Sequence, residues 1–288
     1  MEYIIQNQYL KAKISSLGAE LRELYDSNNI NRMHVPSKQT WNRVSPILFP
    51  QVSRIKGGKY YVNDVAYEMP THGFFRNMEI APIKHEKDSI TFAIKDSEET
   101  HKVYPYSFEF IINYKVNNNS LIVSFEVINK SNTTMRFMLG GHPGFKVPLS
   151  KQESYKDYYL KFQNKETVDA MQVVDGFLAN VYKPCLNNED TINLSHDIFN
   201  PDAIVMKNLT SSYVDLLSHK NDSCIRFYFK DFDILAIWSL QDENANFVCL
   251  EPWNGIQKDF VLEHEKMGVL EIEKNDKKTY SYTIEIIK

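Results

Sequence analysis

Apolar and polar residues alternate along much of the chain. Between Phe108 and Val116 apolar or aromatic side chains stand at every second position, and the alternation resumes between Leu121 and Val127. The four residues 117–120 that separate the two runs are Asn-Asn-Asn-Ser, a composition typical of a turn. A period of two is that of a strand with one buried face, so the segment predicts a β-hairpin.

Further runs extend this pattern. Residues 59–69 predict a hairpin that turns at Asn63-Asp64, residues 225–237 predict two strands around the polar segment 230–233, and residues 280–286 predict a last strand. Helical spacing is scarce: propensity favours a short helix over residues 17–25 and one turn over 195–200. The sequence therefore predicts an all-β fold, with residues 1–288 forming one domain of many antiparallel strands, a large sandwich rather than a small barrel.

Composition narrows the possible functions. The 288 residues carry 33 basic and 37 acidic side chains, a formal net charge of −4, and this argues against nucleic acid as a partner. The 17 Tyr and 17 Phe residues favour strands. No apolar run approaches the roughly 18 residues of a membrane helix, which argues against a membrane partner, and no signal peptide is visible at the N-terminus. We expect a water-soluble, cytoplasmic protein.

The three cysteines are too few and too far apart for a disulfide framework or a metal-binding pair. Cys185, Cys224 and Cys249 show no CxxC spacing and are odd in number. They are typical of reduced, mostly buried thiols in a cytosolic protein.

Three regions combine ionisable residues with apolar neighbours and Gly or Pro. They are residues 45–58 together with 70–77, residues 140–145, and residues 247–255. Taken alone, His72 and His142 are each more typical of a hydrogen-bonded loop histidine than of a catalyst. Glu251 is harder to dismiss, because it directly follows the apolar run 247–250, where an unneeded carboxylate would be costly. The other histidines have polar neighbours and predict surface positions: His34, His85, His101, His196, His219 and His264.

Taken together, these segments resemble the aldose 1-epimerases (galactose mutarotase-like proteins), most closely their LacX-like branch. The resemblance rests on Pro46-Ile47-Leu48-Phe49-Pro50, His72-Gly73-Phe74-Phe75-Arg76, Gly141-His142-Pro143-Gly144-Phe145 and Glu251-Pro252-Trp253, in this order. It extends from Ile14 to the C-terminal strand. The family fold is a large antiparallel β-supersandwich, which agrees with the alternation. The resemblance also implies that residues 19–25 form a strand, against the local propensity.

The resemblance implies a cofactor-independent isomerase that interconverts the α and β anomers of a free aldose. Carried over by motif, Glu251 is the expected general base and His142 the expected general acid. The expected sugar-binding residues are Arg54, His72, Asp202 and Trp253. For Trp41 and Trp253 two readings stay open: a core position, or an aromatic face offered to the sugar. Asp190 and Asp197 are alternatives to Asp202. The acid role predicts that His142 holds its proton beside a carboxylate or carbonyl. We therefore expect the acidic limb of a bell-shaped pH profile to come from Glu251 and the alkaline limb from His142.

Three other readings stay open. A hexose-6-phosphate 1-epimerase would use the same acid and base, with cations for the phosphate; basic residues near the motifs are Arg43, Lys56, Lys59, Arg76 and Lys258. A metal enzyme would use His72, His142 and Glu251 as two-His-one-carboxylate ligands. A non-catalytic carbohydrate-binding or sensing protein would have the same fold without the catalytic activity. We expect a small-molecule sugar as the partner, no metal or other cofactor, and a monomer or homodimer.

Overall fold

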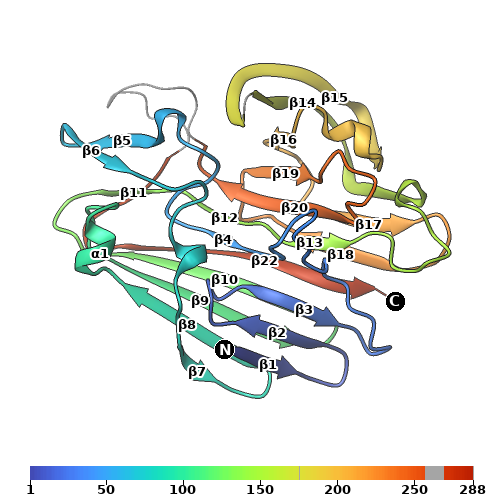
Figure 1. Ribbon diagram of the computed structural model, residues 1–288, viewed down its shortest axis with the longest axis horizontal. Helices are drawn as coiled ribbons and strands as arrows, with labels where there is room; N and C mark the ends of the chain where they lie inside the picture. The colour runs from blue at the N-terminus through green and yellow to red at the C-terminus, as the bar shows by residue number, and fades with distance from the viewer. Residues whose placement is uncertain (175, 257–268, 288) are drawn as a thin grey trace.

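Antiparallel strands dominate the computed structural model, which describes residues 1–174, 176–256 and 269–287 (Figure 1). Within the described residues, fifteen strands belong to one sheet. Its hydrogen-bonded order is β4 (Ile47–Leu48), β12 (Leu139–Gly141), β20 (Phe247–Asn254), β19 (Ile234–Trp238), β16 (Ile204–Lys207), β14 (Tyr158–Val174), β17 (Tyr213–Ser218), β18 (Cys224–Tyr228), β22 (Lys277–Ile287), β10 (Ser120–Asn129), β9 (Phe108–Asn117), β8 (Ser89–Lys95) and β7 (Pro82–His85). Off this path, β13 (Gly144–Lys146) pairs with β20, and β15 (Phe177–Asn193) pairs with β14.

Smaller sheets and short helices complete the described chain. The sheets are β1 (Glu2–Gln6) with β2 (Lys11–Ser15) and β3 (Leu21–Tyr25), β5 (Lys59–Val62) with β6 (Val65–Glu68), and β11 (Met135–Phe137) with β21 (Leu270–Ile272). The helices are α1 (Glu98–His101) and the 3₁₀ turns η1 (Lys56–Gly58), η2 (Phe75–Asn77), η3 (Tyr155–Asp157) and η4 (His196–Phe199). None of the helices in the described residues is long and apolar enough to cross a membrane.

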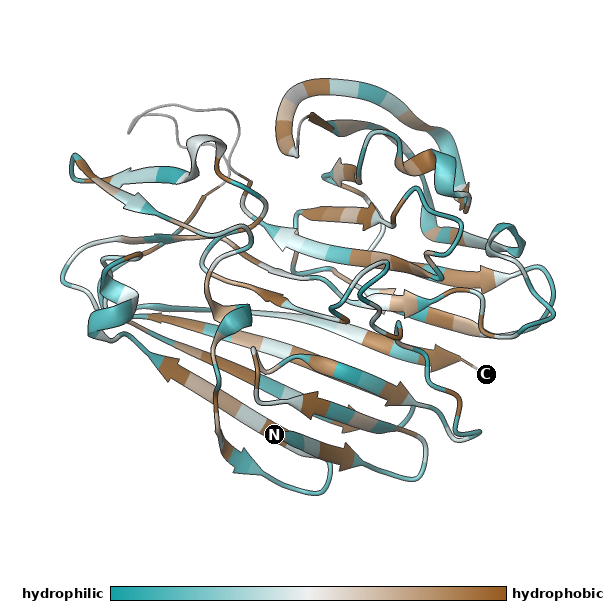
Figure 2. Ribbon diagram, viewed as in Figure 1, coloured by the Kyte–Doolittle hydropathy of each residue, from teal (hydrophilic) through white to brown (hydrophobic). Residues whose placement is uncertain are grey.

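The predicted hairpins are present. Strands β9 and β10 pair from Phe108↔Asn129 to Asn117↔Ser120, and buried side chains alternate with half-buried or exposed ones. The β5–β6 turn places Asn63 and Asp64 at φ 48° and 64°, the left-handed region that two-residue hairpin turns require and that Asn and Asp tolerate well. Figure 2 shows the resulting alternation of hydrophobic and hydrophilic residues along the strands.

The segment 17–25 forms a strand rather than the short helix that propensity favours. Gly18 and Ala19 lie at φ 66° and 47°, which interrupts any right-handed helix before β3 begins at Leu21. Leu21 and Leu24 are fully buried, so this short segment gains more from packing than from its own propensity. The turn expected over 195–200 is present as η4.

The small sheet β1–β3 packs on the face of the large sheet near β8, β9 and β10 (Figure 1). Ile5 and Ile14 from the small sheet join Phe92, Phe110 and Phe125 in one continuous hydrophobic core, and all five are fully buried. The other half of the large sheet carries β20, whose eight residues are all buried. Because β20 is paired with β19 along one edge and with β12 and β13 along the other, its side chains have fixed positions.

Candidate active site

A cleft of about 430 Å³ opens beside β20. Its walls come from the segments around β4 and η2, the β12–β13 connection, the β14–β15 hairpin, the residues before β16, and the ends of β19 and β20. The ionisable side chains that line the cleft are Arg54, His72, Arg76, His142, Asp202 and Glu251. Every ionisable residue that the sequence analysis assigned to the site is in this set, whereas Asp190 and Asp197 are not among the lining residues.

Glu251 reaches the floor of the cleft because of its position in β20. Side chains two residues apart on a strand point to the same face, so Cys249, Glu251 and Trp253 lie in a row. The Glu251 side chain is only 2% exposed. One of its oxygens, Oε2, makes no well-aligned hydrogen bond within the described residues. A buried carboxyl group whose oxygens are not fully hydrogen-bonded is costly to fold, which indicates a role outside packing.

His142 projects from the short connection between β12 and β13, and three glycines around it make room for aromatic rings. A Cβ atom on Gly140 would lie 2.7 Å from Cδ1 of Trp253, and one on Gly141 would lie 2.7 Å from Cε1 of Tyr282. A Cβ atom on Gly144 would lie 2.8 Å from Cζ3 of Trp41. The glycines of this motif are therefore needed for close packing around His142.

The His142 and Glu251 side chains meet directly. Nε2 of His142 lies 3.2 Å from Oε2 of Glu251, and the histidine side chain is 9% exposed. Burial raises the pKa of Glu251 well above its usual range, and the negative charge of Asp202 adds to the shift. Burial lowers the pKa of His142, and the neighbouring His72 and Arg76 add to that shift. Both directions favour the uncharged forms, a carboxylic acid and a neutral imidazole.

This protonation state differs from the one expected from sequence. A carboxyl group does lie beside His142, but it is Glu251 itself. In a site this deeply buried, desolvation is the largest influence on the pKa of both groups, and it disfavours the imidazolium that the sequence analysis expected. Both shifts therefore favour keeping the proton of the pair on Glu251.

His72 is held as a hydrogen-bond donor. Its backbone lies at φ 63°, its N–H donates to the carbonyl oxygen of Ser53 (2.9 Å), and its Nδ1 accepts from the Ser53 N–H (3.1 Å). Because Nδ1 accepts, the neutral ring carries its proton on Nε2. Burial, with Arg76 and Arg54 nearby, lowers the pKa of His72 to about 3, so the ring stays neutral at physiological pH. Its ring stands edge to face with that of His142, with 5.7 Å between the centroids.

Arginines and an aspartate form the polar wall of the cleft. Arg54 is exposed, and its guanidinium lies 5.7 Å from the ring centroid of Phe177, at the start of β15. Arg76 is fixed through its backbone, because Nη1 of Arg43 donates to its carbonyl oxygen at 2.8 Å. Asp202 is half-buried and accepts a hydrogen bond from the Ala203 N–H (2.8 Å).

For Trp41 and Trp253 the sequence left a core position and a sugar-facing position open, and the two residues differ in the structure. Trp253 is 4% exposed and packs in a hydrophobic cluster with residues such as Leu48, so little of its face is open to a sugar. Trp41 instead stacks on His142, with 4.8 Å between ring centroids and 30° between the planes. Trp238 approaches His142 edge-on at 5.6 Å.

His34 is the clearest residue that sequence reasoning misplaced. It was grouped with the surface histidines, but it stands between Met33 and Val35 in the sequence and is 4% exposed. Its ring stacks on Trp41, and its Nε2 lies 3.0 Å from the Trp41 carbonyl oxygen. His34 therefore supports the tryptophan that covers His142. Its partners are distant from it in the chain or lie in a loop, and no local pattern signals that contact.

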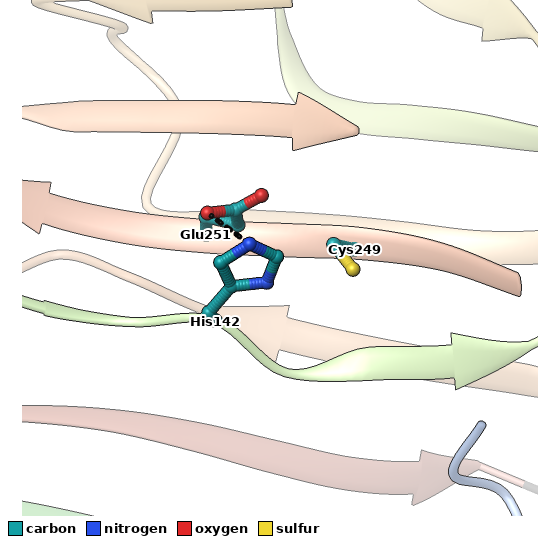
Figure 3. A group of neighbouring side chains, drawn as sticks. All are labelled: His142, Cys249 and Glu251. Atoms are coloured by element: carbon teal, nitrogen blue, oxygen red, sulfur yellow. Dashed lines mark ion pairs between the residues drawn. The ribbon is translucent and has the colours of Figure 1, made fainter. Parts of the chain in front are cut away.

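One group of side chains could hold a metal ion. His142, Cys249 and Glu251 each offer one ligand atom, and these three atoms lie within 4.8 Å of one another (Figure 3). All three residues are buried. The ligand set therefore differs from the His72–His142–Glu251 triad considered from sequence, because Cys249 takes the place of His72. All three cysteines are free thiols, as the sequence predicted.

Comparison with known proteins supports the same family. Residues 1–267 match the family model described as aldose 1-epimerase. The chain is 30% identical to the chromosomal protein LacX of Lactococcus lactis subsp. lactis, with 98% of each chain covered. The solved structure of a galactose mutarotase related enzyme from Lactobacillus acidophilus is 34% identical with a TM-score of 0.94, covering 100% of this chain and 98% of that one. A galactose mutarotase-like protein from Lactobacillus casei ATCC 334 is 26% identical with a TM-score of 0.92, and each chain is fully covered.

Proposed function

Because the chain belongs to the aldose 1-epimerase family, we propose that it interconverts the α and β anomers of a free aldose. The observation that carries the proposal is the buried contact between His142 and Glu251 at the floor of a polar cleft. Mutarotation needs one group to take the proton from the C1 hydroxyl and another to protonate the ring oxygen. An imidazole and a carboxyl group in contact supply both.

The proposed steps conserve the protons of the pair. In ring opening, the Glu251 carboxylate takes the C1 hydroxyl proton while the His142 imidazolium gives its proton to the ring oxygen, and the C1–O5 bond breaks. The products are an open-chain aldehyde, a carboxylic acid and a neutral imidazole. After rotation about C1–C2, the same two groups return their protons in the opposite sense, and the ring closes on the other face of C1.

The neutral pair favoured by burial is the state that closes the ring. The state that opens the ring differs only in the position of one proton, which has moved from Glu251 to His142. The two atoms that exchange it are 3.2 Å apart. The cycle therefore needs no net proton uptake from solvent.

The other cleft residues are proposed to bind and orient the sugar. His72 is oriented to donate from Nε2, which suits a hydrogen bond near the ring oxygen. Asp202 accepts hydrogen bonds from sugar hydroxyls, and Arg54 donates to them from the rim. Trp253 is proposed to act through its indole N–H, because its side chain also lines the cleft.

A phosphorylated hexose is the second candidate substrate, favoured by the two arginines that line the cleft. Arg54 and Arg76 could pair with a phosphate dianion through charge-assisted hydrogen bonds. Among the other basic residues considered from sequence, Arg43 binds Glu20 and the η2 backbone, and Lys59 pairs with Glu68. Nothing is described for the Lys56 side chain, and Lys258 lies outside the described residues.

Polarimetry of freshly dissolved sugars tests the proposal. The protein should accelerate equilibration of at least one free aldose in a panel that includes glucose and galactose. NMR exchange between the anomers of glucose and of glucose 6-phosphate separates the two candidate substrates. Tight sugar binding without acceleration for any member of the panel would refute the enzymatic proposal and support a sensing protein on this fold.

A further inference from the structure

We propose that His142, Cys249 and Glu251 form an inhibitory binding site for a single zinc ion at the floor of the cleft. Zinc bound there would occupy both members of the acid–base pair and stop mutarotation reversibly. Binding itself follows from the arrangement of the three side chains. Only the inhibition rests on the proposed function.

The chemistry of the three ligands selects zinc over the harder divalent cations. Thiolate, imidazole and carboxylate are the three side-chain groups that zinc takes in proteins. Magnesium and calcium prefer all-oxygen sites, and a cysteine gives them no useful ligand. A free thiol in the row formed by Cys249 and Glu251 therefore distinguishes this cluster from an ordinary acid–base pair.

The geometry needs only small side-chain movements. With zinc–nitrogen and zinc–sulfur distances of about 2.0 and 2.3 Å, tetrahedral ligands lie about 3.5 Å apart. The contact of 3.2 Å between His142 and Glu251 already fits this spacing. All three ligand atoms lie within 4.8 Å of one another, so the longest separation must shorten by about 1 Å or slightly more. Rotation of the Cys249 and Glu251 side chains supplies such a movement without changing β20.

A second, independent observation points to a ligand at this site. Nδ1 of His142 makes no hydrogen bond in the part of the chain that the structure describes, and Oε2 of Glu251 makes none either, although Nε2 of His142 lies 3.2 Å from it. Their residues are 7% and 2% exposed. Buried polar atoms are rarely left unpaired in folded proteins, and a cation that coordinates Oε2 of Glu251 would compensate for part of this cost.

The cleft gives zinc a route to the cluster. His142 and Glu251 line the cleft, while Cys249 lies behind the lining, close to Gly144. Zinc would enter from the cleft, bind the three side chains and keep its fourth position toward the opening for water or a sugar hydroxyl. The Cys249 thiol and the Glu251 carboxyl group would release their protons to solvent as the ion binds.

Zinc titration of the full chain tests the site directly. After treatment with EDTA and desalting, wild-type protein should bind one equivalent of zinc, and magnesium at the same concentration should not compete. Mutation of residues that only hydrogen-bond to metal ligands lowers metal affinity 10- to 100-fold. Cys249→Ala removes a ligand itself, so it should lower zinc affinity by about 100-fold. Cys224→Ala removes another buried thiol, on β18, and should bind zinc as tightly as wild type. Cobalt(II) should give thiolate-to-metal absorption in wild type and Cys224→Ala and none in Cys249→Ala.

The activity measurement separates this proposal from the proposed function. Zinc should inhibit mutarotation of the wild-type protein, and EDTA should reverse the inhibition. Bound sugar should protect the enzyme from inhibition by zinc. Cys249→Ala should stay active and should not be inhibited at the same zinc concentration. If no sugar is turned over, the proposed function fails, yet the titration still decides the zinc site. Equal zinc affinity in wild type and Cys249→Ala, or cobalt bound without a thiolate band, would overturn the proposal. Should Cys249→Ala fail to fold, Glu251→Gln keeps the thiol and must also weaken zinc binding.

Discussion

Replacing Glu251 by glutamine should remove proton transfer at C1 while leaving the shape of the cleft almost unchanged. The amide has nearly the same size as the carboxyl group. Its NH₂ group can donate to Nε2 of His142 across the present 3.2 Å contact, so the orientation of the imidazole is kept. The amide cannot accept the C1 hydroxyl proton. We therefore expect a loss in turnover with little change in sugar affinity, because the missing interaction is used mainly in the transition state.

The size of the loss follows from the role of the carboxyl group. A positioned general acid or base contributes roughly 10²–10⁴-fold. Each factor of ten corresponds to about 1.4 kcal/mol, so the barrier should rise by about 3 to 5 kcal/mol. The stability of the fold should not fall, because burial already favours the uncharged form of Glu251, and glutamine is uncharged as well.

Polarimetry gives the rate, and NMR exchange gives it near equilibrium. Glu243→Gln is the matched control, since Glu243 is an exposed carboxylate a few residues before β20 and should leave the rate unchanged. Circular dichroism and thermal melting check that both variants are folded. A folded Glu251→Gln protein that keeps near-wild-type turnover would refute the assignment of Glu251 as the base. A variant that loses sugar binding instead of turnover would make Glu251 a binding residue.

Four other outcomes are expected. His72→Asn should fold normally, because asparagine tolerates the left-handed backbone and its Oδ1 can replace Nδ1 as acceptor. Asparagine lacks the Nε2–H donor, so this variant should raise KM far more than it lowers kcat. Asp202→Asn should weaken sugar binding in calorimetry, whereas Asp197→Asn, outside the cleft, should not. Gly144→Ala should lower the free energy of unfolding, measured with urea, by about 1–3 kcal/mol because its Cβ would meet the Trp41 ring. The profile of kcat/KM against pH should be broad, because the acidic limb reports His142, whose pKa is lowered, and the alkaline limb reports Glu251, whose pKa is raised. An alkaline limb that survives in Glu251→Gln would contradict this assignment.

Alternation of side chains predicted the strands β5, β6, β9, β10, β18, β19 and β22. It is most informative where one face of a strand lies on the continuous core. The β9–β10 hairpin is the clearest case, since its register follows directly from which residues are apolar. The same reasoning failed at residues 17–25, where Leu21 and Leu24 are also compatible with a helix. There the left-handed backbone at Gly18 and Ala19 and the pairing of β3 with β2 decide the structure. Neither is visible in local propensity.

The cleft residues were predictable wherever a motif carried them. Asp202 lacked a strong motif, yet it lines the cleft and its charge contributes to the raised pKa of Glu251. The surroundings of His142 could not be predicted, because Trp41 and Trp238 reach it from separate segments. The glycine at position 144 is the available signal, since a side chain there would collide with Trp41.

The protonation state of the pair could not be predicted either, because it depends on burial, and it has a consequence for catalysis. In water a glutamate and a histidine side by side would form an ion pair, since the ordinary pKa of glutamic acid is about two units below that of histidine. Desolvation in the cleft disfavours both charged forms, while the short contact between His142 and Glu251 favours them. These opposing effects bring the ion pair and the neutral pair closer in free energy than they would be in water. A mutarotase runs the same chemistry in both directions through one open-chain aldehyde, so it needs both proton positions within reach. Burial of the pair is therefore part of the proposed mechanism, because it keeps the ion pair that opens the ring and the neutral pair that closes it close in free energy.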